Sequence, residues 1–178
     1  MKRAFYPLAA LLLLAGSAFT FFTAQEWQIA DGYSIAFSSS DVGGIFKDFK
    51  GAILFDDQNP GASRFDVSLS VASVNTGNGL QNKHVKSDEW LDATKYPEIH
   101  YTSRTITKTA NGYQVTGDLT MHGVKKPVVI PFTFQKTAKG ASFTGSFTVK
   151  RSDFQVGKPG GDVAEEVKID VSVPVTKK

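Results

Sequence analysis

Strict alternation of apolar and polar residues recurs along the chain, and no other feature of the sequence constrains the fold as much. Successive side chains of a β-strand point to opposite faces of a sheet, so an alternating segment has one apolar and one polar face. The clearest alternating segments are residues 65–71, 113–121, 143–149 and 167–175. Less regular segments of the same kind are residues 33–37, 53–55, 99–106 and 128–134. The sequence therefore predicts an all-β fold of amphipathic strands.

Turn residues between these segments predict that neighbouring strands run antiparallel. Asn111-Gly112 is a pair that favours a tight two-residue hairpin, because both positions of that turn need a positive φ. Lys139-Gly140 and the stretch from Gly123 to Pro127 mark further reversals. The long helical crossovers that a parallel sheet requires are missing from the pattern. Short antiparallel strands of this kind form a sandwich or a barrel.

One segment, residues 77–96, interrupts the strand pattern and predicts a helical insertion. Asn78 is suited to cap a short helix that runs through Val85. Ser87 is followed by two acidic residues and predicts the start of a second helix, which Pro97 would end. We expect this insertion to cover one end or one flank of a barrel.

The apolar faces of the strands point either to the interior of a soluble barrel or to the lipid around a membrane barrel. Two Trp and five Tyr are too few for the two aromatic girdles of a membrane barrel. The polar faces also carry few of the bulky charged groups that fill the interior of a small membrane barrel. The sequence therefore favours a soluble barrel of about eight strands with its apolar side chains inside.

The interior of such a barrel is either filled by side chains or left with room for one small ligand. The 14 Phe residues fit both a filled core and an aromatic-lined tunnel. Gly117 and Gly145 fall in the inward phase, where they either leave gaps that favour a cavity or let the sheet coil sharply. Strand phase predicts that a cavity would be lined by Phe37, Phe46, Phe65, Val67, Leu69, Val115, Leu119, Met121, Ile130, Phe132, Phe143, Phe147, Val149, Ile169 and Val171.

The first 24 residues predict an export signal peptide. Lys2 and Arg3 precede an apolar centre from Ala9 to Ala15, and small residues follow. Cleavage after Ala24 is favoured over cleavage after Ala18, and the alternative is a retained membrane anchor. The remainder, residues 25–178, is long enough for one domain with its own core. We therefore expect a periplasmic or secreted protein, with no transmembrane span once the signal is removed.

Charge and cysteine content exclude several classes of function. The chain has 20 basic and 17 acidic residues, two of the basic ones lie in the expected signal, and the two signs alternate along the sequence. Nucleic-acid binding, which needs a concentrated basic face, is therefore not expected. The absence of cysteine excludes disulfides, thiolate metal sites and cysteine nucleophiles.

The remaining polar residues predict no catalytic and no metal site. His84 and Asp88 share a face of the expected insertion, but two ligands without a third make a poor metal site. His100 is expected on the outer surface of its strand, and His122 in a hydrogen bond within its turn. No nucleophile elbow of the Gly-x-Ser-x-Gly kind is present. We expect no enzymatic activity and no cofactor.

A series of short motifs extends along the chain. In order, they are residues 27–29 (WQI), 34–37 (SIAF), 44–51 (GIFKDFKG), 73–78 (SVNTGN), 84–87 (HVKS), 91–97 (LDATKYP), 117–128 (GDLTMHGVKKPV) and 151–154 (RSDF). Their order and spacing resemble those of the YceI-like family of polyisoprenoid-binding, lipocalin-like proteins. The sequence departs from the usual pattern near its start. The family often has His where Tyr33 stands, and another His just beyond the strand, where Ser38 to Ser40 lie.

The resemblance implies an eight-stranded antiparallel, lipocalin-like barrel with a short helical insertion around residues 78–95. It also implies that a long-chain isoprenoid or a similar amphiphile binds in the interior, without catalysis. The alternatives are a ligand-free structural or stress-response module with a filled core and an enzyme that modifies a lipid head. The partners we expect are an isoprenoid or other long-chain lipid and a second copy of the chain in a homodimer.

Two charged residues, Arg151 and Asp153, continue the inward phase of the strand before them. They form either a structural ion pair that closes one end of the barrel or, through Arg151 together with Lys47 or Lys50, a contact with a polar lipid head. The cost of burying an unpaired charge favours the structural pair.

Overall fold

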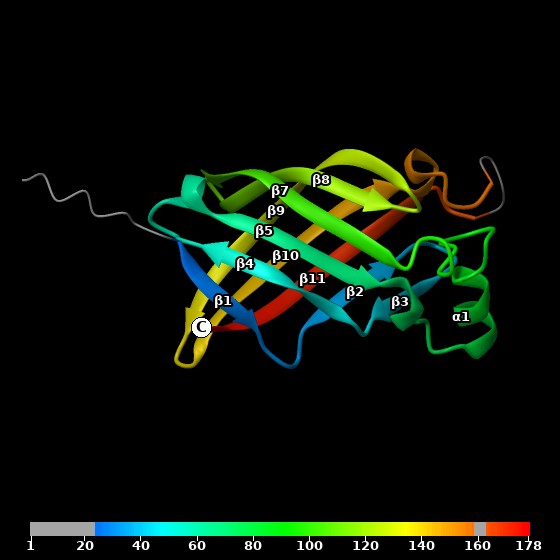
Figure 1. Ribbon diagram of the computed structural model, residues 1–178, viewed down its shortest axis with the longest axis horizontal. Helices are drawn as coiled ribbons and strands as arrows, with labels where there is room; N and C mark the ends of the chain where they lie inside the picture. Colours follow the sequence, from blue (N-terminus) through cyan, green and yellow to red (C-terminus); the bar gives the residue numbers. More distant parts are fainter. Residues whose placement is uncertain (1–23, 159–162) are drawn as a thin grey trace, which may run out of the picture.

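The computed structural model describes residues 24–158 and 163–178, so the expected signal peptide lies, apart from Ala24, outside the described residues. The described residues form one antiparallel barrel, and its first and last strands lie side by side (Figure 1). The strands are β1 (Gln25–Ile29), β2 (Ser34–Ser38), β3 (Gly43–Phe46), β4 (Phe49–Phe55), β5 (Arg64–Ser70), β6 (Val74–Asn75), β7 (Glu98–Thr109), β8 (Gly112–Met121), β9 (Val124–Thr137), β10 (Gly140–Lys150) and β11 (Glu166–Lys177). The short helices are α1 (Gly79–Val85) and the 3₁₀ turns η1 (Pro60–Ala62), η2 (Val71–Ser73) and η3 (Arg151–Phe154).

Eight strands form the closed ring, in the order β1-β4-β5-β7-β8-β9-β10-β11, and the pairing of β11 with β1 closes it. β11 pairs with β2 over Lys168–Ser172 and with β1 over Val175–Lys177, so β1 and β2 are two halves of one strand position. β3 and β4 are related in the same way, because β2 pairs with β3 and β1 pairs with β4. The eight-stranded antiparallel barrel expected from the sequence is therefore confirmed.

The alternating segments of the sequence all lie in strands, apart from their end residues Tyr33 and Val71. The hairpin turn between β7 and β8 differs from the prediction by one residue. Its two loop residues are Ala110 and Asn111, because Thr109 pairs with Gly112, and the positive φ belongs to Gly112 and not to Asn111. A turn with two positive φ values does occur at the next hairpin, where His122 has φ 51° and Gly123 has φ 75°.

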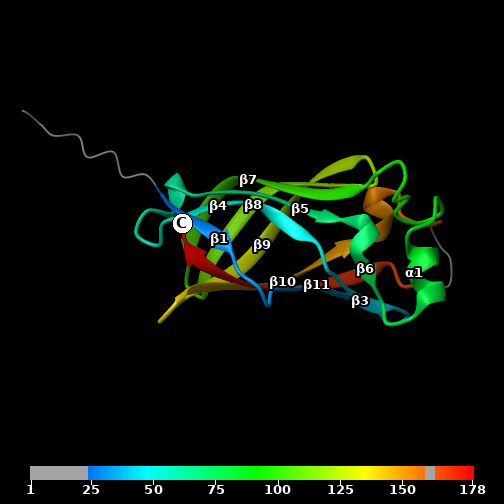
Figure 2. The ribbon, with the colours of Figure 1, turned by 60° about the horizontal axis from the view of Figure 1, so that its bottom comes forward.

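The helical insertion lies at one end of the barrel, opposite the C-terminus (Figures 1 and 2). The Asn78 side chain accepts hydrogen bonds from the backbone amides of Leu80 and Gln81, at 2.9 and 3.2 Å, so the predicted cap of α1 is confirmed. The predicted second helix is wrong. The Ser87 hydroxyl bonds back to the His84 carbonyl at 2.8 Å, and turns follow in which Asp92 has a φ of 45° that a helix does not tolerate.

The end of the barrel opposite α1 is filled by aromatic rings. This aromatic plug consists of Trp27, Phe55, Phe65, Tyr113, Phe132, Phe134 and Phe143. Phe55 is at its centre and only 1% exposed, and the Trp27 indole donates a hydrogen bond to the Phe55 carbonyl at 3.0 Å. The nearest ring centroids, at 4.8 Å, are those of Phe55 and Phe134. Most of these contacts are tilted or edge-to-face, the geometry that aromatic pairs prefer.

Candidate functional site

A cavity of about 260 Å³ lies inside the barrel, between the aromatic plug and the helical insertion. Its volume is close to the lower limit of the roughly 300–1,000 Å³ that small-molecule sites occupy. Nearly all of its lining is apolar and comes from strands around the whole ring. Every residue that strand phase predicted for such a wall lies on it, namely Phe37, Phe46, Phe65, Val67, Leu69, Val115, Leu119, Met121, Ile130, Phe132, Phe143, Phe147, Val149, Ile169 and Val171. Their contact with a ligand stays a prediction.

The floor of the cavity is formed by Phe65, Phe132 and Phe143, which belong to both the plug and the cavity wall. The barrel is therefore filled at one end and hollow in the rest. The two alternatives for its Phe residues, a filled core and an aromatic lining, each hold for one part of the interior. The described interior is not filled throughout, as a ligand-free module with a filled core would require.

Some of the wall comes from segments to which strand phase does not apply. These residues are Val85, Trp90 and Leu91 of the helical insertion and Val156, Val163 and Ala164 beyond η3. They lie in a short helix, turns and loops, where side-chain direction does not follow a period of two. Strand phase could also have identified other wall residues that the prediction omitted, namely Ile35, Phe49, Ile53, Ile99, Tyr101, Val167 and Val173.

Gly117 does not leave a gap in the cavity wall, because the ring of Tyr101 covers it. A Cβ atom at residue 117 would lie 2.5 Å from the Thr102 carbonyl oxygen and 2.7 Å from the Tyr101 ring. The Tyr101 hydroxyl reaches past this glycine and donates to the Val128 carbonyl at 3.2 Å. Gly145 does line the cavity, but a Cβ atom there would lie 2.7 Å from the Pro131 carbonyl oxygen. Close approach of a neighbouring strand therefore accounts for both glycines, and neither leaves a gap for a ligand.

The buried hydroxyl of Tyr101 predicts that the free energy of unfolding depends on pH in the alkaline range. Burial raises the pKa of its hydroxyl well above the usual value of about 10. The folded chain therefore holds this proton more tightly than the unfolded chain, and the resulting stabilisation is complete below about pH 10 and is lost as the pH rises toward the folded-state pKa. We expect the free energy of unfolding to fall as the pH rises above about 10, and to fall less in Tyr101→Phe. Urea denaturation at each pH checks this, and an equal fall in both proteins contradicts it.

Arg151 is buried, at 3% exposure, and its donors are used by the protein itself. Its guanidinium donates to four backbone carbonyls, those of Ala164 (3.1 Å, from Nε), Val156 (3.0 Å) and Lys158 (2.9 Å, both from Nη1), and Val163 (3.1 Å, from Nη2). The Glu165 carboxylate lies 3.7 Å from Nη2. The prediction of an ion pair between Arg151 and Asp153 is wrong. The strand alternation ends at Arg151, where η3 begins, and Asp153 is exposed. This arrangement favours a structural role for Arg151, and its contact with a lipid head stays a prediction.

The two lysines considered for a head-group contact lie away from the cavity. Lys47 is exposed and does not belong to the lining. Lys50 forms an ion pair with Glu98 on the outer wall, at 2.7 Å. A hydrogen bond within this pair holds the pKa of the Glu98 carboxyl below its usual value. The structure therefore does not bring Lys47 or Lys50 together with Arg151.

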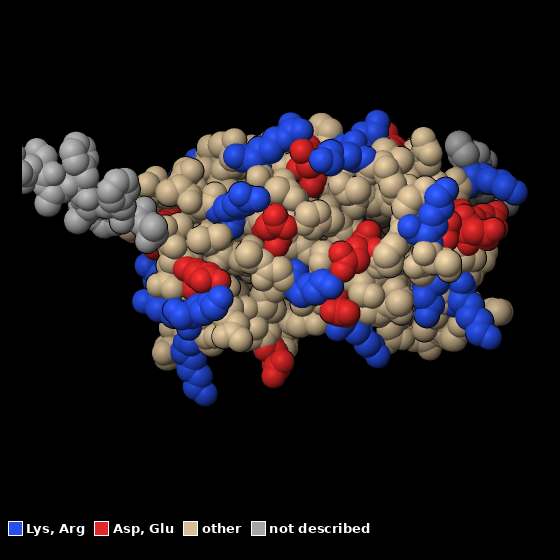
Figure 3. All heavy atoms as spheres, in the orientation of Figure 1, with Lys and Arg blue, Asp and Glu red and all other residues tan. Residues whose placement is uncertain are grey.

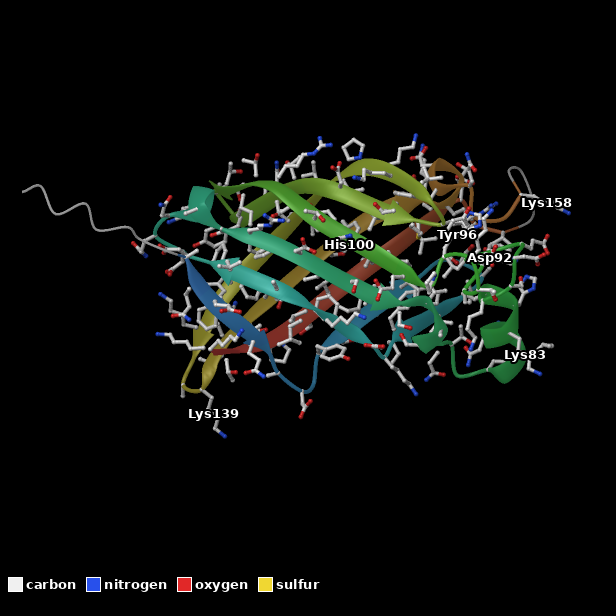
Figure 4. The ribbon with its side chains drawn as sticks, in the orientation of Figure 1. Lys83, Asp92, Tyr96, His100, Lys139 and Lys158 are labelled. Atoms are coloured by element: carbon white, nitrogen blue, oxygen red, sulfur yellow. The ribbon has the colours of Figure 1, made fainter. Side chains whose placement is uncertain are left out.

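The histidines are placed on the outside or in turns. His100 projects from the outer wall (Figure 4), as predicted, and its Nε2 lies 2.7 Å from an Asp66 carboxylate oxygen. The predicted hydrogen bond of His122 within its own turn is wrong. The His122 Nδ1 lies 3.3 Å from the carbonyl oxygen of Phe154 in η3. His84 packs against the Trp90 ring. Within residues 24–158 and 163–178, no group of three or more His, Asp or Glu residues is arranged to hold a metal ion.

The outer surface carries both signs of charge. On the face shown in Figure 3, Lys and Arg side chains are interspersed with Asp and Glu. Several charged residues of the surface form ion pairs, such as Arg104 with Asp118 at 2.6 Å. In the part of the chain that the structure describes, no helix is both long and apolar enough to cross a bilayer.

Comparison with known proteins gives consistent matches over nearly the whole chain. The family model of the YceI-like domain matches residues 21–175. Protein YceI from Salmonella newport is 32% identical over 182 residues, which cover 94% of this chain and 93% of that protein. The crystal structure of Burkholderia cenocepacia BcnA matches with a TM-score of 0.80 and 28% identity, over 84% of this chain and all of that chain.

A third match is to a domain with much lower sequence identity. A polyisoprenoid-binding domain from Saccharophagus degradans has a TM-score of 0.67 and 16% identity, over 87% of this chain and 99% of that chain. At this identity the likeness concerns the fold alone. The family model and the curated relative both extend over most of the chain, so the protein belongs to the YceI-like domain family.

Proposed function

We propose that this chain binds a long-chain isoprenoid or a related amphiphilic lipid, with the hydrocarbon part in the barrel cavity, and carries it without catalysing a reaction. The observation that carries this proposal is the chemistry of the cavity wall. The wall is almost entirely apolar, and three of its polar side chains are bonded to the protein's own backbone. The hydroxyls of Ser39 and Tyr101 donate to backbone carbonyls, as does the Arg151 guanidinium. Such a wall suits a hydrocarbon, and its described lining contains no Asp, Glu, His, Lys or Cys side chain that could act as an acid, a base or a nucleophile activated by one.

Membership of the YceI-like family and the fold shared with a polyisoprenoid-binding domain support the same ligand class. The export signal expected at residues 1–24 supports a periplasmic or extracellular location for the carrier. In such a compartment a long-chain lipid needs a protein to shield it from water, because its hydrocarbon is poorly soluble.

Binding would be driven by transfer of the hydrocarbon out of water. Each buried methylene contributes roughly 0.8 kcal/mol, whereas association costs about 4–15 kcal/mol in lost motion and ordering. Several isoprene units are therefore needed before binding becomes tight. An apolar wall discriminates one methylene by only roughly 1–3 kcal/mol, so we expect selection by chain length and bend more than by exact structure.

Extraction of bound lipid tests this function directly. Protein produced in bacteria and purified without detergent is denatured and extracted with organic solvent, and the extract is measured by mass spectrometry. We expect a long-chain species in an amount comparable to that of the protein, and none in protein that has been stripped of lipid and refolded. The proposal fails if no long-chain species is extracted and the stripped protein also takes up none when it is offered lipid.

A further inference from the structure

Strands β9 and β10 separate along the cavity. They are paired only where Thr137–Phe132 face Gly140–Gly145. Beyond this point each strand stays paired on its other side, β9 with β8 up to Val124 and β10 with β11 up to Lys150. We call the unpaired part, residues 124–131 of β9 and 146–150 of β10, the seam. The seam interrupts the ladder of backbone hydrogen bonds that joins neighbouring strands of the wall.

Two prolines explain why the pairing of β9 with β10 ends there. The Pro131 carbonyl points toward β10, since its oxygen lies 2.7 Å from the position of a Cβ at Gly145. Alternate residues of a strand direct their backbone groups to the same neighbour, so Pro127 also has its backbone edge toward β10. Proline has no amide hydrogen and cannot donate to a ladder. Two of the donors that β9 would offer to β10 are therefore missing.

The seam is apolar on its inner side. Ile130 from β9 and Phe147 and Val149 from β10 line the cavity at this place, and all three are only half-buried. On the outer side a shallow hollow extends over Pro131 and Ser146. The hollow and the cavity share the wall residues Phe132, Thr144, Gly145 and Val171. The cavity and the outer hollow thus lie on opposite sides of the same wall residues where the seam begins.

The two ends of the cavity are blocked more firmly than the seam. One end has the aromatic plug as its floor, with Phe55 almost fully buried behind it. At the other end, Val85 and Leu91 of the insertion lie over the cavity, and Arg151 holds the segment beyond η3 by four hydrogen bonds. Along the seam, in contrast, no backbone pairing joins residues 124–131 to residues 146–150, and the hydrogen bond from His122 to the Phe154 carbonyl lies just beyond its far end.

We propose that the seam is the route by which a hydrocarbon chain enters and leaves the cavity, sideways between β9 and β10. This inference rests on the proposed function. Moving β9 away from β10 breaks no backbone ladder there, whereas opening the wall at β8–β9 or β10–β11 breaks several backbone hydrogen bonds. The strands move apart to admit the chain, and Phe147 and Ile130 close over it afterwards.

Reversible cross-linking across the seam tests the route. The chain has no cysteine, so thiols can be introduced in chosen pairs. Val129→Cys with Thr148→Cys joins two exposed positions that would face each other if the β9–β10 register continued. Gln135→Cys with Ser142→Cys is the matched control, because these residues face each other in the paired part of the same strands and neither lines the cavity. A short bifunctional methanethiosulfonate joins each pair, and a reductant releases it.

The readout is the uptake of parinaric acid, a fluorescent long-chain polyene, by lipid-stripped protein. We expect the cross-link at Val129 and Thr148 to slow uptake at least about fivefold and reduction to restore it. The cross-link at Gln135 and Ser142 should leave the rate unchanged. An unchanged rate with the seam cross-linked overturns the route, whatever the final level of binding. Absence of uptake by every form, reduced forms included, instead contradicts the proposed function.

Discussion

Replacing Ile169 by Trp is expected to lower the affinity for a long-chain lipid at least about tenfold, which corresponds to a loss of about 1.4 kcal/mol of binding free energy. Ile169 is the fourth residue of β11, lies between Phe37 of β2 and Phe147 of β10, and lines the cavity. The indole would occupy space that the hydrocarbon needs. Because the cavity is hollow at this place, the larger side chain can be accommodated without the strain that overpacking causes in a filled core.

The affinity is measured by titrating lipid-stripped protein with parinaric acid. Lys168→Trp is the matched control, since it adds the same side chain one residue earlier, on the exposed face of β11. Its ion pair with Asp170 is on the surface and contributes little to stability. Both variants should give the circular dichroism spectrum of a folded β protein. Equal affinities of the two variants would contradict a ligand site inside the barrel.

Replacing Arg151 by Met is expected to lower the free energy of unfolding by about 3 kcal/mol or more. The substitution removes the donors of four backbone carbonyls and the cation near Glu165. Carbonyls that lose a buried donor remain desolvated, and this cost exceeds the value of an ordinary exposed hydrogen bond. The methionine fills much of the same volume, so the loss is due mainly to polar groups and not to a void.

Urea denaturation measures this loss. Arg151→Lys should recover only a small part of it, because one ammonium group cannot reach carbonyls that the planar guanidinium contacts in several directions. Lys150→Met is the control, since Lys150 is exposed and precedes Arg151 in the chain. A loss below about 1 kcal/mol in Arg151→Met would show that the guanidinium does not hold this segment.

The cavity wall could be predicted from the sequence because its residues lie in regular strands. Phe143 and Phe147 in β10, like Ile169 and Val171 in β11, are separated by even numbers of residues, and a closed barrel turns every such set inward. Ile99 and Tyr101 of β7 have the same inward phase and could have been predicted as wall residues too. Family resemblance supplied the number of strands and the class of ligand.

What the sequence could not provide depends on contacts between distant segments. The inward direction of Arg151 follows from strand phase, but its partners do not, because the carbonyls it contacts belong to an irregular segment beyond η3. It could not separate the Phe residues of the plug from those of the lining, since both sets share the inward phase and differ only in their position along the barrel axis. The seam could not be predicted either, because strand phase gives the direction of side chains and does not show where the pairing of β9 with β10 ends.

The prolines of β9 also bear on the solubility of the protein. An open strand edge is a template on which a strand of another molecule can add, and this is a common beginning of aggregation. At residues 127 and 131 the edge of β9 offers carbonyls without amides, and the exposed Lys125 and Lys126 place charge on the same strand. A foreign strand would find few donors and would have to lie beside two cations. The edge of β9 can therefore stay unpaired at the seam, and we expect the molecules not to associate through this edge at high concentration.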